Sequence, residues 1–158
     1  MTEDETERRS ADPARWTHSA VAEPAAATTL RRRVRRWAET IGVEEDVVDA
    51  IELSAYEALA NVVEHAYITA AAPGIMTLTA VHDAATVTIT VTDAGTWKPP
   101  VATAHRRHGL ALAAAVSDHI DIGHPGLGTV VTMTWSLPTP VGNHSTPIRP
   151  EASRPRDR

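Results

Sequence analysis

The chain has 158 residues and a formal net charge of −5, and it contains no cysteine. This length suits one domain with tails, because single hydrophobic cores usually take roughly 100–200 residues. The missing cysteines exclude disulfide bonds and thiolate zinc sites. The acidic balance and the few aromatic residues argue against nucleic-acid binding. No apolar run reaches the roughly 18 residues of a membrane span, and the charged N-terminus is no signal peptide, so we expect a cytoplasmic protein.

Both ends of the sequence differ in composition from its middle. Residues 1–13 are charged and almost without large apolar side chains, and residues 138–158 contain repeated prolines. Such compositions cannot build a packed core and predict disordered tails. We therefore expect the ordered domain over residues 14–137.

The first half of this domain shows a strand pattern followed by helical periodicity. A first strand is expected around residues 16–22. The apolar side chains of the next segment then recur at helical spacing and end before Gly42: Leu30, Val34, Trp37, Ala38 and Ile41. A longer helix is predicted over residues 44–67, with acidic residues in its first turn, where the helix dipole favours them.

The second half changes to a period of two. Strands are predicted over 75–81 and 86–92, joined by the hairpin turn "VHDAAT". A turn-rich segment and a short helix in "HGLALAAAVSDHI" follow, and strands over 119–123 and 129–137 complete the pattern. Because the strands do not alternate regularly with helices, we predict an α+β fold. The expected form is a two-layer sandwich whose mixed, mostly antiparallel sheet carries about three helices on one face.

The long helix contains a column of polar residues. Glu57, Asn61 and His65 are four residues apart and lie on one slowly turning face, which leaves Leu53, Ala60 and Val63 to face the sheet. A carboxylate can accept a proton from a hydroxyl, and an amide oxygen is a ligand that Mg²⁺ accepts beside phosphate oxygens. The same spacing is also typical of an ordinary solvated helix face.

Three further positions have the chemistry of a nucleotide site. Asp93 and Gly95 follow a strand, where the carboxylate can accept a hydrogen bond and the glycine permits close approach. Gly109 begins a helix, where free N–H groups favour phosphate, although a glycine there is also an ordinary helix cap. Thr129, after Gly128, begins the last strand.

In their order along the chain, four motifs resemble a known family. "EALANVVEHAY", "DAGTWKPP", "HGLALA" and "GTVVTMTW" resemble the N box, the two glycine boxes and the final strand of the histidine kinase-like (Bergerat) ATPase fold. The chain most resembles the short, stand-alone RsbW-type anti-sigma factors, which are serine-protein kinases, over about residues 14–137.

The resemblance implies a function and partners. It implies an anti-sigma factor that binds ATP and Mg²⁺ and phosphorylates a serine or threonine of a STAS-type anti-anti-sigma partner. The same protein would sequester a sigma factor, contact neither nucleic acid nor membrane, and form a homodimer.

The resemblance also assigns roles residue by residue. Glu57 matches the base, Asn61 the Mg²⁺ ligand and Asp93 the acceptor of the adenine amino group, while Gly95 leaves room for the ring. The nucleotide-site residues implied in this way are Asn61, His65, Asp93, Gly95, Arg107, His108, Gly109, Leu110 and Thr129.

Two departures from the family pattern leave alternatives open. Arg107 stands where the second glycine box has its first glycine, and it cannot easily adopt the positive φ that glycine permits. A second hypothesis is therefore a non-catalytic module that sequesters a partner on the same fold, with or without ATP. Trp97 replaces a glycine of the first box and either packs over the nucleotide or stiffens a proline-rich lid.

Other features are interpreted more simply. His105 and His108 have metal-ligand spacing but no third ligand, and ordinary loop histidines are favoured. The arginines around residues 31–36 form a solvated helix face or bind an acidic partner or nucleic acid, and the solvated face is favoured. A sensor kinase fragment is disfavoured, because no helical hairpin with a phospho-acceptor histidine precedes the ATPase-like motifs.

Overall fold

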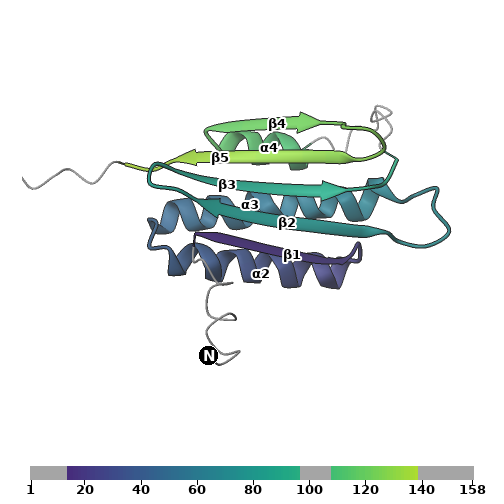
Figure 1. Cartoon of the computed structure of the whole chain (residues 1–158), viewed down its shortest axis with the longest axis horizontal. Helices are drawn as coiled ribbons and strands as arrows, with labels where there is room; N and C mark the ends of the chain where they lie inside the picture. Colours follow the sequence, from purple (N-terminus) through teal and green to yellow (C-terminus); the bar gives the residue numbers. More distant parts are fainter. Residues whose placement is uncertain (1–13, 97–107, 139–158) are drawn as a thin grey trace, which may run out of the picture.

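The computed structural model describes residues 14–96 and 108–138, and its strands and helices form two layers (Figure 1). The predicted tails and the segment containing Trp97, His105 and Arg107 lie outside the described residues. The elements in chain order are β1 (Arg15–Val21), α2 (Pro24–Thr40), α3 (Glu45–Asn61), the π-helical turn η1 (Val62–Ala66), β2 (Ile75–His82), β3 (Thr86–Asp93), α4 (His108–Val116), β4 (His119–Gly123) and β5 (Thr129–Ser136).

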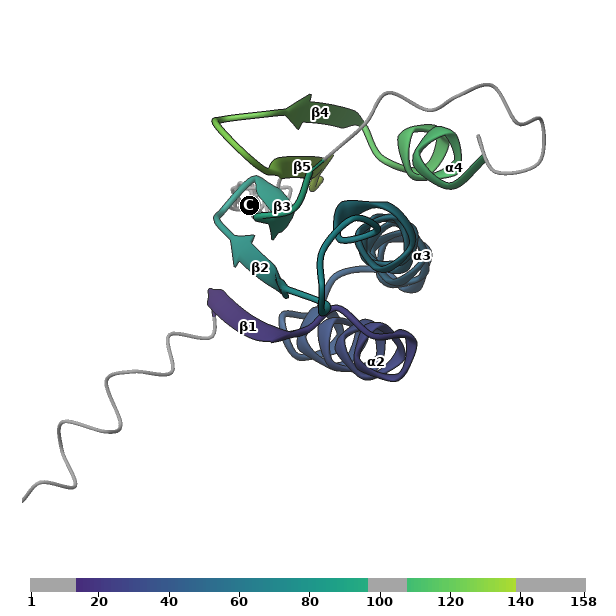
Figure 2. The same ribbon diagram turned by 90° about the vertical axis from the view of Figure 1, so that its right-hand side faces the viewer.

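The predicted α+β sandwich is confirmed. The five strands form one sheet in the order β1-β2-β3-β5-β4, and each pairing among the described strands is antiparallel. Figure 2 shows α2, α3 and α4 on the same face of this sheet. Within residues 14–96 and 108–138, no helix is both long and apolar enough to cross a membrane.

Side-chain alternation along the strands separates the core from the open face of the sheet. Val87, Ile89 and Val91 of β3 are buried beneath the helices. The intervening threonines lie on the other face, where Thr90 stands between Thr79 of β2 and Thr132 of β5. A sheet with one apolar and one polar face needs helices on one side only, which explains the two layers.

Helix α2 begins earlier than the periodicity predicts. Its first residue is Pro24, whose fixed φ suits the first position of a helix, and Ala27 extends the buried stripe toward that end. At the other end Gly42 has φ 75°, the left-handed conformation that terminates many helices. The predicted end is confirmed, and the helix begins six residues before Leu30, the first apolar residue of the predicted pattern.

The prediction of which side of α3 faces the sheet was wrong. Leu53, Ala60 and Val63 line surface grooves of about 270 and 120 Å³ beside α2. The sheet-facing side chains lie elsewhere on the helix and are buried: Val48, Ile51, Ala55, Ala58 and Leu59. Small residues on that side let the helix pack closely on the strands, and the whole polar column is thereby turned toward α4.

The hairpin between β2 and β3 is built around Asp83. Its Oδ1 accepts hydrogen bonds from the backbone N–H groups of Ala85 and Thr86, both at 2.9 Å, and its Oδ2 accepts one from the Thr86 hydroxyl. These bonds, led by the one from Ala85, lower the pKa of the Asp83 carboxyl. The turn predicted from "VHDAAT" is thus held by an aspartate that favours its charged form.

A network centred on Arg35 joins α2 to α3. The guanidinium donates to Asp49 at 2.7 Å and to Glu52 at 2.6 Å, and it also pairs with Glu39 and Glu45. Hydrogen bonds to Asp49 and then Glu52 raise the pKa of Arg35 above its ordinary value. Because its guanidinium is already paired with carboxylates, Arg35 is not available to bind a partner.

The remaining arginines of α2 divide into two groups. Arg31 lies over the Tyr56 ring, 5.0 Å from its centroid, and pairs with Glu52 at 3.5 Å. Arg32, Arg33 and Arg36 are exposed. The Arg33 guanidinium also contacts the His18 ring of β1, and a partner that docks on this helix would meet these exposed side chains.

We expect Arg35→Met to lower the free energy of unfolding, because several carboxylates of α3 would lose their shared cation. Exposed ion pairs are screened by salt, so the loss should shrink between low and high ionic strength. Arg36→Met is the matched control, since Arg36 is exposed on the same helix. Chemical denaturation at two salt concentrations measures both; equal effects for the two variants would contradict the network's role.

Candidate nucleotide site

Glu57 and Asn61 lie on the side of α3 that faces α4. Both side chains are half-buried, and Asn61 is the last residue of the α-helix before the π-helical turn. Ser54, one turn before Glu57, is fully buried, and its hydroxyl has no hydrogen-bond partner among residues 14–96 and 108–138. The two predicted chemical groups thus share the face expected from their spacing, at the border between α3 and α4.

Gly109 brings the first turn of α4 against Glu57. A Cβ on Gly109 would lie only 2.7 Å from Oε2 of Glu57, so a side chain at this position would crowd the carboxylate. The N-terminal end of a helix carries a partial positive charge, which favours a nearby anion. The close approach, and not a positive φ, is the reason for glycine here.

Helix α4 is held in this position by contacts farther along its length. Ala113 is fully buried, and Leu110 packs partly against the core. The indole Nε1 of Trp135 in β5 donates to the carbonyl of Val116 at 2.8 Å. These contacts anchor the helix to the sheet and leave its first turn beside Glu57.

Asp93 ends β3 on the helix-covered face of the sheet. In the strand register it stands between Met76 of β2 and Thr129 of β5, and Thr129 is buried. The Oδ1 atom of Asp93 accepts a hydrogen bond from the N–H of Gly95 at 2.9 Å. In the described part of the chain, Oδ2 accepts no hydrogen bond, so it can accept one from a ligand amino group.

The turn after Asp93 packs directly on the end of the long helix. A Cβ on Gly95 would lie 2.0 Å from the carbonyl oxygen of Ala66, and the N–H of Thr96 donates to that oxygen at 2.8 Å. Just before the neighbouring strand β5, a Cβ on Gly128 would lie 2.1 Å from the carbonyl oxygen of Asp93. Both glycines are therefore required by the approach of backbone to backbone.

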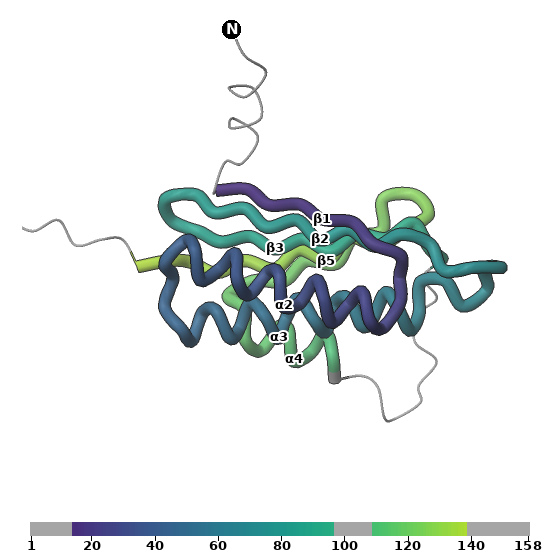
Figure 3. The backbone as a smooth tube through the Cα atoms, turned by 90° about the horizontal axis from the view of Figure 1, so that it is seen from below, coloured from purple at the N-terminus to yellow at the C-terminus, as the bar shows by residue number. Residues whose placement is uncertain are grey.

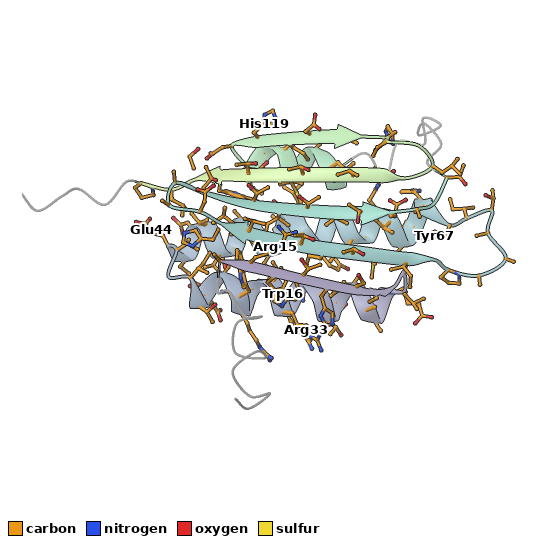
Figure 4. The ribbon with its side chains drawn as sticks, in the orientation of Figure 1. Arg15, Trp16, Arg33, Glu44, Tyr67 and His119 are labelled. Atoms are coloured by element: carbon orange, nitrogen blue, oxygen red, sulfur yellow. The ribbon has the colours of Figure 1, made fainter. Side chains whose placement is uncertain are left out.

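The sequence interpretation missed Tyr67. Its hydroxyl donates to the carbonyl of Ile75 at 2.6 Å and accepts from the N–H of Ala94 at 3.0 Å. Figure 4 labels Tyr67 at the end of the sheet where β2 begins and β3 ends. The sequence does not indicate that a tyrosine at the end of this helix bonds both to β2 and to the residue after β3.

The other predicted residues are placed less directly at the site. His65 lies in the π-helical turn, half-buried, with its Nε2 3.7 Å from Glu64. The backbone of His108 begins α4. The remaining predicted nucleotide residue, Arg107, and the side chain of His108 lie outside the described residues.

The site therefore consists of two parts joined through one helix. Glu57, Asn61 and Gly109 form the part beside α4, and Asp93 and Thr129 form the part at the end of the sheet. The π-helical turn connects them, and such turns occur frequently at functional sites. The tube in Figure 3 shows α3 running between α2 and α4 along the whole sheet.

Comparison with known proteins places this arrangement in a family. Residues 20–135 match the family model of the histidine kinase-like ATPase domain. This match covers most of the chain, which therefore belongs to that family.

A solved structure agrees with this assignment. The structure of the RsbU and RsbW domains of Rv1364c from Mycobacterium tuberculosis is similar, with a TM-score of 0.63 and 28% sequence identity. The alignment covers 78% of this chain and 32% of that one, so this chain spans about a third of its length. The two comparisons thus agree: this chain is a histidine kinase-like ATPase domain, and it is similar to a solved structure that contains an RsbW domain.

We expect Gly95→Ala to lower the free energy of unfolding by about 1–3 kcal/mol, the usual cost of overpacking. The added methyl group would meet the backbone of Ala66, which cannot rotate away. Gly123→Ala is the matched control, because a Cβ there comes no closer than 3.9 Å to Pro125. Thermal unfolding of both variants tests this, and equal stability would refute the close contact.

We expect Gly109→Ala to behave differently, because the atom it meets is the free end of a flexible side chain. Stability should stay within about 1 kcal/mol of the wild type, since alanine also favours the helical conformation. The Glu57 carboxylate should move away from α4. A crystal structure of the variant measures this displacement, and a carboxylate in its original place would refute it.

Proposed function

We propose that this protein is an anti-sigma factor that phosphorylates a serine or threonine of a STAS-type anti-anti-sigma partner, using ATP and Mg²⁺. Membership of an ATPase domain family implies ATP binding. The observation that supports a kinase is the position of Glu57, whose carboxylate lies beside the first turn of α4 at Gly109. A proton acceptor beside the helix terminus favoured by phosphate is what transfer to a hydroxyl requires.

The residues present fit the nucleotide by their donor and acceptor chemistry. Asp93 offers the open Oδ2 to an amino group, and Thr129 offers a hydroxyl on the neighbouring strand. Asn61 would hold Mg²⁺ through its amide oxygen, and the metal ion would offset charge on the phosphate oxygens. Leu110 and Gly109 would lie near the phosphates at the start of α4.

In the proposed transfer, Glu57 accepts the proton of the partner's hydroxyl group. The hydroxyl oxygen forms a bond to the γ-phosphorus of ATP, the bond from that phosphorus to the bridging oxygen breaks, and ADP leaves. Catalysis in such reactions is mostly positioning and charge stabilisation. In this chain, the half-buried Glu57 and the N-terminus of α4 would provide the positioning and the charge stabilisation.

The regulatory part of the proposal concerns two protein partners. The RsbW-type assignment supports a sigma factor as the sequestered partner and an anti-anti-sigma protein as the phosphate acceptor. The exposed arginines of α2 and the homodimer expected for the family belong to this part of the proposal. We infer that the protein acts in the cytoplasm, where both partners work.

A non-catalytic binding module is the competing function. The sequence feature that favours it is Arg107, at the position where the family has glycine. Such a module would bind its partner on the same fold without turnover. It predicts partner binding that does not change with ATP.

We expect the full chain to bind ATP with Mg²⁺ and to transfer labelled phosphate to its anti-anti-sigma partner. Glu57→Gln should bind ATP within about twofold of wild type but lose roughly 10²–10⁴-fold in transfer rate, because the amide cannot accept the proton. Calorimetry and a phosphate-transfer assay measure the two steps.

Glu44→Gln is the matched control, the same change at the opposite end of α3. It should leave both steps unchanged. Retained transfer in Glu57→Gln would remove Glu57 as the base, and a wild-type chain that binds its partner but no ATP would support the non-catalytic module instead.

A further inference from the structure

The end of the long helix and the turn after β3 are joined by one residue, Tyr67. Its hydroxyl bridges the carbonyl of Ile75 at 2.6 Å and the N–H of Ala94 at 3.0 Å. One oxygen atom thus links η1, the start of β2 and the residue after Asp93.

The Tyr67 ring is itself fixed by a second close contact. A Cβ on Gly74 would lie 2.2 Å from the ring, so the glycine lets the chain pass directly over it. A tyrosine held both by its ring and by its hydroxyl has little freedom, and it can hold Ala94 in one position.

Backbone contacts on the other side complete this attachment. The carbonyl of Ala66 accepts from Thr96 at 2.8 Å and lies against Gly95. The residues after Asp93 are therefore tied to two consecutive residues of the helix end. The orientation of the Asp93 carboxylate follows, because its Oδ1 is bonded to the N–H of Gly95 within the same turn.

We propose that Tyr67 is a positioning residue that aims Asp93 at the nucleotide base and thereby sets a preference for adenine. This inference rests on the proposed nucleotide-binding function. A carboxylate only accepts hydrogen bonds; adenine presents an amino donor where guanine presents a carbonyl acceptor. Fixing the carboxylate therefore favours ATP over GTP, and a loosely held turn would discriminate less.

The hydrogen bonds of Tyr67 are exposed enough for water to replace them. Removing the hydroxyl should therefore alter the position of the turn more than the stability of the fold. Glu57 and Asn61 lie in the α-helix before the π-helical turn. Their part of the site should be little affected.

The test is Tyr67→Phe, with Tyr56→Phe as the matched control. The chain has two tyrosines, and Tyr56 lies on the α2 side of α3 beneath Arg31, away from Asp93. Tyr67→Phe should raise the Kd and KM for ATP about 10-fold, the effect of one lost hydrogen-bonding group, and should lower the preference for ATP over GTP. The kcat at saturating ATP should stay within about twofold.

Hydrogen exchange in the nucleotide-free chain tests the same proposal without relying on activity. The amides of residues 94–96 should exchange faster in Tyr67→Phe than in wild type or Tyr56→Phe. Unchanged exchange would overturn the proposal, whether or not the chain binds ATP.

The affinities for ATP and GTP distinguish a failure of the role of Tyr67 from a failure of the proposed function. If the wild type binds ATP but Tyr67→Phe keeps the same Kd and the same preference, the role of Tyr67 is refuted and the proposed function stands. An equal loss for ATP and GTP with a lower Tm would show a purely structural role and overturn the proposal. A wild-type chain that binds no ATP would refute the proposed function itself.

Discussion

The carbonyl group of Ala66 is the contact on which the candidate site depends. The carbonyl oxygen accepts a hydrogen bond from the N–H of Thr96. It also lies against Gly95, whose missing side chain lets the turn after β3 approach the backbone of the helix end. This contact fixes the end of β3 to the end of the long helix. Asp93 and Asn61, more than thirty residues apart in the chain, are thereby brought to the same end of the long helix.

The long helix α3 serves a different purpose on each of its three sides. Toward the sheet it presents small and apolar residues such as Ala55 and Leu59, which are fully buried. Toward α2 it presents carboxylates that share the guanidinium of Arg35. Toward α4 it presents Glu57 and Asn61, held half-buried. Because the side toward the sheet is fully buried, the side toward α4 can carry polar groups without loosening the helix.

Helix α4 is attached in a way that suits a site at its first turn. It buries Ala113 and accepts a hydrogen bond from Trp135 at its last residue, so its C-terminal half is anchored to the sheet. The first turn is placed against Glu57 by Gly109. Gly109 therefore has a local role in this protein, because its missing side chain permits the contact between α4 and Glu57 of α3.

Periodicity alone predicted much of this architecture. The alternation in β3 and the apolar spacing of α2 identify the layers, because a period of two or 3.6 residues directly reflects which side is buried. The sheet-facing side of α3 was predicted wrongly, and the first residue of α2 was not predicted. Alanine is compatible with either side of a helix, so the buried face of an alanine-rich helix is decided by packing.

The sequence by itself determined the fold class and the order of the motifs, and through the family resemblance it proposed the residues of the candidate site. The fold class follows from local patterns, because periodicity reflects which side of an element is buried. Only the tertiary structure decided that Arg35 joins two helices, that Gly95 and Gly109 accommodate Ala66 and Glu57, and that Tyr67 bridges two strands. Each of these contacts joins residues from different elements, and no local pattern in a sequence records which atoms of another element will lie beside it.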